Sequence, residues 1–316
     1  MKDLRIVFMG TPDFAVTILE KMLKEKLNVV GVLTAPDKPA GRGQKLMECA
    51  VKKFAKSKEL LVLQPTNLKD EGFLDRLKRL NANLQVVVAF RMLPKAVWAM
   101  PAYGTFNLHA SLLPDYRGAA PINWALINGE EKTGVTTFFI DEKIDTGEII
   151  LQEEVFITPK MNAGELHDQL MHKGADLVVK TIKNIEKGTV STTKQPKTTS
   201  EKNAPKLFRE NCKLNWALSA EQAHNKIRGL SPYPGAWCFM NTGKEQQETV
   251  KIFGSVPIKT NHNKLPGTMV QEKNTLKVFV KDGYIEILEM QLPGKRKMAV
   301  KDILNGYSFD TDSQML

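Results

Sequence analysis

The sequence predicts an α/β domain with a mainly parallel sheet, followed by a small β domain. Up to residue 188, apolar runs of strand length alternate with segments of helical periodicity, which is the pattern of strands covered by helices. From residue 210 on, short segments alternate apolar and polar residues, as half-buried strands do. Residues 189–209 lie between the two domains. Their composition predicts a basic linker, because Lys, Arg, Ser, Thr and Pro make up most of the segment and only Glu201 is acidic.

In the first domain we expect strands and helices to alternate. The expected strands span residues 4–9, 28–33, 86–90, 105–109 and 135–140, and the expected helices span residues 13–26, 48–58, 71–80, 119–127 and 163–186. The last helix is indicated by Leu166, Leu170, Leu177 and Ile182 near helical spacing, and Gly188 is a plausible end for it.

In the second domain, Ser219 and Gln222 can form a capping box for one short helix. Strands are expected at residues 237–240, 249–253, 268–271, 276–280 and 284–289, and Asp282-Gly283 is a hairpin turn before the last one. Short strands at this spacing predict a small β domain.

Composition bounds the class of protein. A chain of 316 residues exceeds what one hydrophobic core usually organises, and 42% hydrophobic residues can fill two. The apolar run at the start is too short for a signal peptide, and no membrane span is evident. The cysteines Cys49, Cys212 and Cys238 are widely spaced, which favours neither a disulfide framework nor a zinc site. We therefore expect a cytoplasmic protein without a metal. As a separate expectation, we take the protein to be a monomer.

The net charge of +10 favours an anionic partner without identifying it. The first strand and helix are joined by Gly10-Thr11-Pro12-Asp13, which lacks the G-x-G-x-x-G pattern, so a nicotinamide site is disfavoured and a simple turn is expected. His167 and His172 are five residues apart on a helix, a poor metal spacing.

An amide and an imidazole stand two residues apart at the end of the 105–109 strand. On a strand this spacing directs Asn107 and His109 to one face, held by the sheet yet able to reach a cleft. A tight loop after the 135–140 strand offers the carboxylates of Asp141 and Asp145. Asn107, His109 and Asp145 together supply donors for an oxyanion and a carboxylate that orients the imidazole, as acyl transfer to an amine requires.

Each of these residues also has a structural interpretation. His109 alone fits a hydrogen-bonded core histidine, Asn107 a turn former and Asp145 an Asx cap. Ser111 shares the alternation of Asn107 and His109, but the G-x-S-x-G elbow of a serine hydrolase is absent around it.

These motifs resemble those of the 10-formyltetrahydrofolate-dependent formyltransferases, whose signature is Asn-x-His before Ser-Leu-Leu-Pro and a later loop ending in Asp-Thr-Gly. Residues 9–15, 36–43 and 116–121 look like the branch that formylates methionyl-tRNA, and residues 231–236 resemble the C-terminal domain of that branch. The resemblance implies a Rossmann-like formyltransferase domain at residues 1–188, a basic linker at 189–209 and an OB-like, tRNA-binding β-barrel at 210–316.

The resemblance also implies a site for the formyl donor, 10-formyltetrahydrofolate. The residues it implicates in folate binding are Val88, Ala89, Phe90, Arg91, Met92, Leu93, Ser111, Leu112, Leu113, Pro114, Asp141 and Ile144. Two departures concern this pocket, because relatives often have Tyr-Gly at Phe90-Arg91 and Gly at Lys143.

Initiator methionyl-tRNA is the implied acceptor, and residues 36–46 are the expected RNA-binding loop. Lys38, Arg42 and Lys45 in it can grip phosphates beside the end of the RNA, although such loops are usually plain solvated connections. Further cations of the linker and β domain, among them Lys213, Lys226 and Arg228, could form a track for RNA or only keep these segments soluble.

The mechanism expected from the cluster is direct attack of the α-amine on the formyl carbon, with Asn107 and His109 donating to the oxyanion and Asp145 fixing His109. Two alternatives stay open. A formyltransferase for a small amine, such as a glycinamide nucleotide or an amino sugar, would share the three residues without needing the basic loop. A non-enzymatic RNA-binding protein would leave the cluster unexplained.

Overall fold

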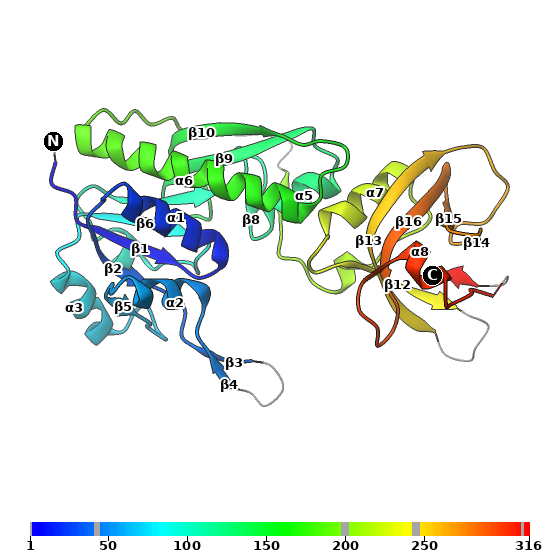
Figure 1. Cartoon of the computed structure of the whole chain (residues 1–316). Helices are drawn as coiled ribbons and strands as arrows, with labels where there is room; N and C mark the ends of the chain where they lie inside the picture. The colour runs from blue at the N-terminus through cyan, green and yellow to red at the C-terminus, as the bar shows by residue number, and fades with distance from the viewer. Residues whose placement is uncertain (1, 41–44, 197–201, 242–246, 311–312) are drawn as a thin grey trace. The chain divides into compact units, whose positions relative to one another are not determined.

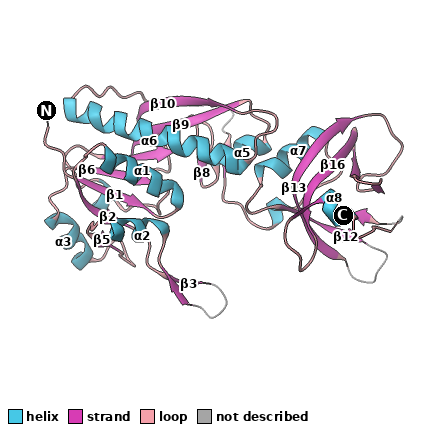
Figure 2. Ribbon diagram, viewed as in Figure 1, coloured by secondary structure: helices cyan, strands magenta, loops and turns pink. Residues whose placement is uncertain are grey.

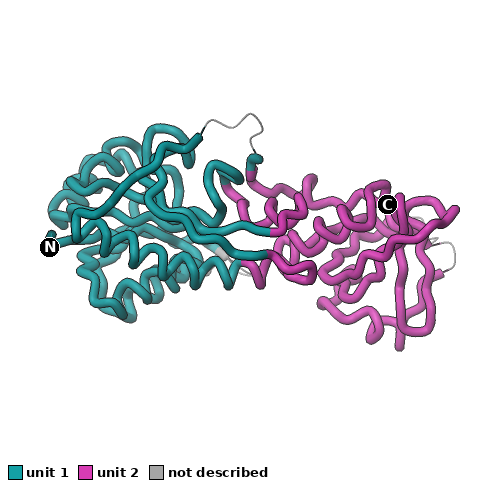
Figure 3. The backbone as a smooth tube through the Cα atoms, turned by 90° about the horizontal axis from the view of Figure 1, so that it is seen from above, with its two compact units in different colours: residues 1–118, 132–156, 167–203 teal, residues 119–131, 157–166, 204–316 magenta. Residues whose placement is uncertain are grey.

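The computed structural model describes residues 2–40, 45–196, 202–241, 247–310 and 313–316. The chain divides into two compact units (Figure 3). Unit 1 comprises residues 1–118, 132–156 and 167–203, and unit 2 comprises residues 119–131, 157–166 and 204–316. Each unit is described by itself.

Unit 1 is built on a seven-stranded sheet with the order β10-β9-β7-β6-β1-β2-β5. Its strands are β1 (Ile6–Gly10), β2 (Val29–Leu33), β5 (Val62–Leu63), β6 (Leu84–Val88), β7 (Thr105–His109), β9 (Lys132–Phe139) and β10 (Ile149–Phe156). The five neighbouring strands β5, β2, β1, β6 and β7 are parallel. At one edge, β9 pairs antiparallel with β7, and β10 pairs antiparallel with β9. The predicted mainly parallel sheet is therefore confirmed.

The central strands β1 and β6 are apolar and almost entirely buried because helices cover both faces of the sheet (Figures 1 and 2). The helices of unit 1 are α1 (Asp13–Lys24), α2 (Ala50–Ser57), α3 (Glu71–Arg79), α4 (Lys95–Trp98) and most of α6 (Ala163–Lys187). On one face, Val7 and Met9 of β1 share a core with Phe73 and Leu77 of α3. Helix α1 contacts α6 through the ring of Phe14 and His167.

The strand order reverses at β1, since the chain moves from β1 to β2 on one side and later crosses to β6 on the other. In open parallel sheets, ligands bind outside the carboxyl ends of the strands at such a switch point. Gly10 ends β1 there, and a Cβ on it would lie 2.6 Å from the Cβ of Ala15, so the turn into α1 requires glycine.

The expected loop at residues 36–46 is partly a two-stranded ribbon. Strands β3 (Lys38–Ala40) and β4 (Lys45–Met47) pair antiparallel and project away from the main sheet in Figure 1. At its base, Asp37 accepts hydrogen bonds from Lys52 at 2.6 Å and from Gln64 at 2.8 Å. These donors, Lys52 first, lower the pKa of Asp37.

Unit 2 contains an antiparallel sheet with the order β14-β15-β16-β13-β12-β18. Its strands are β12 (Ala236–Asn241), β13 (Glu248–Lys259), β14 (Met269–Gln271), β15 (Leu276–Val280), β16 (Gly283–Gln291) and β18 (Gln314–Met315), with β17 (Met298–Ala299) beside β16. A bridge between Thr268 and Gln314 brings the ends of the sheet together. The expected small β-barrel is confirmed and is nearly closed, and the predicted capping box at Ser219 starts α7 (Ala220–Gly229).

Two segments that precede the expected linker belong to unit 2 by their contacts. Helix α5 (Pro121–Ile127) packs on α7, where Asn123 donates to the Gly229 carbonyl at 2.7 Å. Residues 157–166 hold the guanidinium of Arg228 through the carbonyls of Thr158 and Met161. Sequence boundaries and compact units therefore do not coincide in this chain.

Candidate active site

Strand β7 places Asn107 and His109 on one face of the sheet. The strand is paired on both sides, with Asn107 opposite Val87 of β6 and Phe138 of β9, so its position is fixed. His109 is buried, and its Nε2–H donates to the carbonyl of Tyr116 at 2.8 Å. The other ring nitrogen, Nδ1, is therefore the one that remains for a ligand or a charged neighbour.

The carboxylate of Asp145 lies beside that nitrogen. The register pairs Phe106 with Phe139, so the 140–148 loop begins near the start of β7 and folds back to reach its end. Asp145 Oδ2 then lies 3.9 Å from His109 Nδ1, which is an ion-pair distance when the ring is protonated but too long for a hydrogen bond. The predicted convergence of Asp145 on His109 is present in the structure.

The side chain of Asn107 is half-buried. Among the described residues it makes no hydrogen bond, so its amide is available to a ligand on the His109 side of the strand. An uncommitted amide next to a fixed imidazole is the arrangement that oxyanion stabilisation requires.

Hydrogen-bond donors hold both the backbone carbonyl and the carboxylate of Asp145. Its φ of 54° lies in the left-handed region, which Asp tolerates better than most residues. Its Oδ2 accepts from the N–H of Gly118 at 2.9 Å, and its carbonyl accepts from Arg117 Nε at 3.1 Å and Gln195 Nε2 at 2.9 Å. Two residues on, a Cβ on Gly147 would lie 1.7 Å from the Phe139 carbonyl oxygen, so this turn requires glycine.

Arg117 and Gln195 were not predicted as site residues. Gln195 falls in the expected solvated linker, yet it is half-buried, and Thr193 nearby exchanges two backbone hydrogen bonds with Ile149. No sequence signal distinguishes this glutamine from its Ser, Thr and Lys neighbours, because its contacts are made only in the folded chain.

The 111–114 loop follows β7 directly and is held by hydrogen bonds to neighbouring segments. The Ser111 hydroxyl donates to the Asp115 carbonyl at 2.6 Å, and the Ser111 carbonyl accepts from Thr136 at 2.6 Å. Gln152 donates to the carbonyl of Leu113 at 3.0 Å. Because its hydroxyl is bound to a backbone carbonyl, Ser111 helps to hold the end of β7 and is not placed to act as a nucleophile.

The residues expected to contact folate fall into two groups. Val88, Leu93, Ser111 and Leu113 are buried, so they can offer only backbone groups to a ligand. Ala89, Met92 and Ile144 are exposed, and the last two present large apolar side chains beside the site, with exposed fractions of 71% and 59%. A salt bridge of 2.8 Å between Lys95 and Glu142 joins the segment after β6 to the loop that carries Ile144.

Partners within the chain are found for three of the expected folate residues, Phe90, Arg91 and Asp141. Arg91 donates to the carbonyls of Pro65 and Thr66, lies 5.6 Å from the ring centre of Phe90, and its pKa is lowered by burial. Asp141 accepts from the backbone of Lys143 at 3.0 Å and from the hydroxyl of Thr146 at 2.8 Å. Arg91 thus joins the segment after β6 to the segment at residues 65–66. Leu112 and Pro114 are half-buried in the supporting loop.

The expected RNA-binding residues lie on or near the β3–β4 ribbon. Lys38 is exposed on β3, whereas Arg42 and the side chain of Lys45 lie outside the described residues. Leu46 and Met47 on β4 are exposed.

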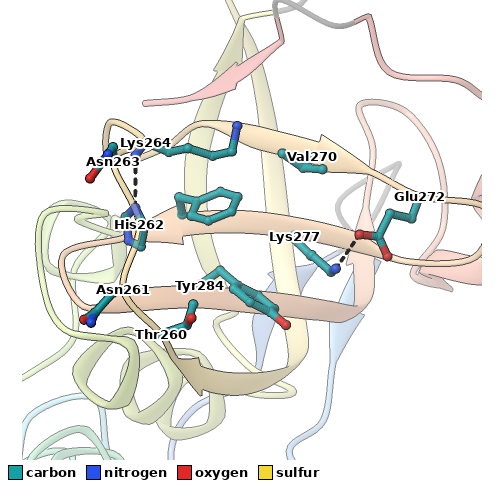
Figure 4. A pocket seen from close by; sticks show the side chains of 10 residues that line it. Thr260, Asn261, His262, Asn263, Lys264, Val270, Glu272, Lys277 and Tyr284 are labelled. Atoms are coloured by element: carbon teal, nitrogen blue, oxygen red, sulfur yellow. Dashed lines mark hydrogen bonds and ion pairs between the residues drawn. The ribbon is translucent and has the colours of Figure 1, made fainter.

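The barrel of unit 2 carries a cavity of about 670 Å³ (Figure 4). Its lining is Thr260, Asn261, His262, Asn263, Lys264, Val270, Glu272, Lys277, Phe279 and Tyr284. The Phe279 and Tyr284 rings lie 5.7 Å apart, and the ammonium groups of Lys264 and Lys277 lie 5.5 Å and 5.3 Å from their respective centres. Both ring nitrogens of His262 are bound to backbone groups, so this histidine is structural.

Of the cations expected to form an RNA track, Arg228 is not available. It is buried and bound to Asn225, Thr158 and Met161, so that part of the hypothesis is wrong. Lys226 is half-buried, and burial lowers its pKa. Lys213 lies 5.0 Å from the ring centre of Phe239 and remains suitable for RNA.

In the part of the chain that is described, no cluster of three or more His, Cys, Asp or Glu side chains is placed to hold a metal ion. Likewise, none of its helices is long and apolar enough to cross a membrane.

Residues 4–182 match the Formyl transferase family, and residues 206–308 match the Formyl transferase, C-terminal domain. Solved structures agree in fold. HypX from Aquifex aeolicus, determined with tetrahydrofolic acid, has a TM-score of 0.65 and 17% identity over 96% of this chain and 47% of its own. WlaRD, a sugar 3N-formyl transferase, has a TM-score of 0.63 and 22% identity over 94% of this chain and all of its own. The fold and the family match are those of a formyltransferase.

Curated relatives define the family within that class. Methionyl-tRNA formyltransferase of Flavobacterium johnsoniae is 56% identical over the full length of both chains. The enzyme of the same name from Bacteroides fragilis is 48% identical over 97% of this chain and 96% of its own. The chain therefore belongs to the methionyl-tRNA formyltransferase family.

Proposed function

We propose that this chain transfers the formyl group of 10-formyltetrahydrofolate to the α-amino group of initiator methionyl-tRNA, for translation initiation. The observation that carries the chemistry is the approach of Asp145 to His109 beside the uncommitted amide of Asn107. The choice of acceptor is supported by the full-length identity to enzymes named for methionyl-tRNA.

The chemical step is a direct transfer without a covalent enzyme intermediate. The lone pair of the neutral α-amine forms the new N–C bond at the formyl carbon, and the carbonyl electrons move to oxygen. Asn107 Nδ2 and the protonated Nδ1 of His109 donate to that oxyanion. When the oxyanion collapses, the bond from carbon to N10 of the folate breaks, N10 takes up a proton, and the amine loses one. Asp145 stabilises the charged ring during this exchange.

The folate would lie between the segment after β6 and the 140–148 loop. Exposed Met92 and Ile144 offer apolar surface to its rings, while the backbone at Val88 and Ala89 offers polar groups to the pterin. Tetrahydrofolic acid bound to HypX is consistent with a folate ligand on this fold. We assign Arg91 to shaping the segment after β6, and Leu113 with the rest of the 111–114 loop to supporting the end of β7.

The acceptor end of the tRNA would be gripped by the β3–β4 ribbon through Lys38, Arg42 and Lys45. Unit 2 offers a second surface for the RNA. Its cavity pairs Lys264 and Lys277 with two aromatic rings, and Lys213 lies over Phe239. Cations interleaved with aromatic faces suit the backbone and the bases of unpaired nucleotides.

The test is an assay of purified protein with 10-formyltetrahydrofolate and three acceptors: charged initiator methionyl-tRNA, a glycinamide nucleotide and an amino sugar. We expect formylmethionyl-tRNA as the product, and the folded Asn107→Ala protein serves as a control that should form it much more slowly. Formylation of a small amine in preference to the tRNA would overturn the proposed acceptor. Failure to use 10-formyltetrahydrofolate with all three would overturn the proposed donor.

A further inference from the structure

We propose that Gln195 is a positioning residue that holds Asp145 against His109. This inference rests on the proposed function, because it assigns Gln195 a role in placing a catalytic carboxylate. Gln195 follows α6 by eight residues in a segment whose composition predicts only a linker.

The amide of Gln195 spans the turn that contains Asp145. Its Nε2 donates to the carbonyl of Asp145 at 2.9 Å and to the carbonyl of Gly147 at 2.8 Å. Its Oε1 accepts from Arg117, at 2.7 Å from Nη2 and 3.2 Å from Nε. The side chain of Gln195 thus uses both N–H donors on the turn that contains Asp145 and its oxygen on Arg117, whose Nε also binds the Asp145 carbonyl.

Asp145 needs such support because of its backbone conformation. A φ of 54° at a residue other than glycine is sparsely populated and persists only where the surroundings hold it. Its carbonyl is fixed by Arg117 and Gln195, while its carboxylate is fixed by the N–H of Gly118. Rotation of this backbone would carry Oδ2 away from His109 Nδ1.

The segment that carries Gln195 is itself anchored. Thr193 donates to the Ile149 carbonyl at 2.9 Å and accepts from the Ile149 N–H at 2.8 Å. Since Ile149 begins β10, Gln195 reaches the turn from a backbone fixed to the main sheet. A solvated linker with an incidental contact would not have this pairing.

The first test compares three variants of the full chain by single-turnover formylation and by steady-state kinetics. Gln195→Ala removes the whole amide, whereas Gln195→Glu keeps its size and its acceptor for Arg117 but loses both donors. Ser191→Ala is the matched control, since Ser191 is exposed in the same segment. We expect the Ala and Glu variants to lose roughly tenfold to a hundredfold in kcat, with KM for both substrates changed by less than about twofold.

A double-mutant cycle then separates positioning from general support. If Gln195 acts through Asp145, Gln195→Ala should slow the wild type but have almost no further effect on Asp145→Asn. Additive losses, near-normal kcat in Gln195→Glu, or a rise in KM alone would each overturn the proposal. Inactivity of the wild type with methionyl-tRNA would instead count against the proposed function, because the Gln195 role is judged only from ratios between active proteins.

Discussion

At the scale of single residues, the proposed site combines a side chain that already has a hydrogen-bond partner, His109, with one that has none among the described residues, Asn107. His109 has its Nε2–H bound to the carbonyl of Tyr116, which fixes both the ring and its tautomer. Nδ1 then faces Asp145 at 3.9 Å, and protonation there creates a charge that the carboxylate stabilises. Asn107 has no such commitment in the described chain. Because the His109 ring is already held in place and the Asn107 amide is available, these side chains need not rearrange when negative charge develops on the substrate oxygen.

The first prediction concerns these three residues. Asn107→Ala and His109→Ala each remove one donor to the oxyanion, so each should slow formyl transfer by roughly a hundredfold or more while the fold survives. Asp145→Ala should also be severe, because it removes the partner of His109. Single-turnover formylation measures the loss, and circular dichroism verifies folding. A folded His109→Ala protein with a near-normal rate would exclude His109 from the chemistry.

Much of this site could be predicted from the sequence because strand alternation and a short loop motif are local signals. Asn107 and His109 follow from their spacing on one strand, and a carboxylate at Asp145 follows from the loop after the next one. Arg117 and Gln195 could not be found in this way. Their contacts with Asp145 span 28 and 50 residues of sequence and exist only after folding.

The second prediction concerns thiol reactivity. Cys238 is fully buried, and burial raises its pKa to about 12, so only about one part in ten thousand is thiolate at pH 8. Cys49 is partly exposed. Maleimide labelling of the native protein at pH 8, mapped by mass spectrometry, should therefore modify Cys49 well before Cys238, and urea should abolish the difference. Equal native rates would show that the barrel core is open to reagents.

At the scale of elements, the β3–β4 ribbon is the largest departure from the sequence interpretation. Residues 36–46 were expected to form an RNA-binding loop without regular structure, but the two flanks of this segment pair as strands. Composition missed this pairing because each strand has only three residues. The ribbon also has an anchored base, through Asp37 and Lys52, which suits an arm that must meet a large ligand.

The third prediction tests the ribbon. Arg42→Leu and Lys38→Leu should each weaken the use of methionyl-tRNA and leave the affinity for a folate analogue nearly unchanged, because the proposed folate site lies on other segments. Titration of both ligands measures the two effects separately, with Lys69→Leu, an exposed lysine before α3, as the control. Equal losses of folate and tRNA binding would assign the ribbon to the folate pocket.

The fourth prediction concerns pH and helix α7. Burial lowers the pKa of His224, opposed by its hydrogen bond to the Pro159 carbonyl, while the nearby charges of Arg228 and Glu221 act in opposite directions. The folded state thus disfavours the charged ring relative to the unfolded chain. Its contribution to stability should be fully present above the unfolded pKa of about 6.5 and be lost as pH falls through the lower folded value.

Urea unfolding between pH 5 and 8 measures that dependence. In His224→Gln the pH dependence below about 6.5 should flatten, since no group titrates at this position. An unchanged slope in the variant would assign the acid sensitivity to other residues.

At the scale of the whole molecule, the barrel and the parallel sheet were both predicted, yet the compact units cut across the order of the sequence. Residues 119–131 and 157–166 precede the linker but make their contacts in unit 2. Helical periodicity could indicate α5 without indicating its partner α7, because periodicity reports a buried face and not what covers it. A fragment that ends at Gly188 would keep α5 but lose the rest of the unit 2 core on which α5 packs, and it would also lose Gln195. The role of the barrel is therefore better tested in the full chain.

The last prediction therefore uses charge-neutral variants of the full chain. Each lysine that covers an RNA phosphate releases counterions, so log affinity falls with log salt by about 0.7 to 0.9 per contact. Lys213→Gln and Lys264→Gln, on the aromatic surfaces of unit 2, should each weaken tRNA binding and lower the slope by roughly that amount if they contact phosphates. Lys69→Gln should leave the slope unchanged. Fluorescence titrations over one salt range give all four slopes. If neither barrel variant differs from the wild type in affinity or slope, these lysines do not contact the tRNA, and the cations of the barrel serve its solubility.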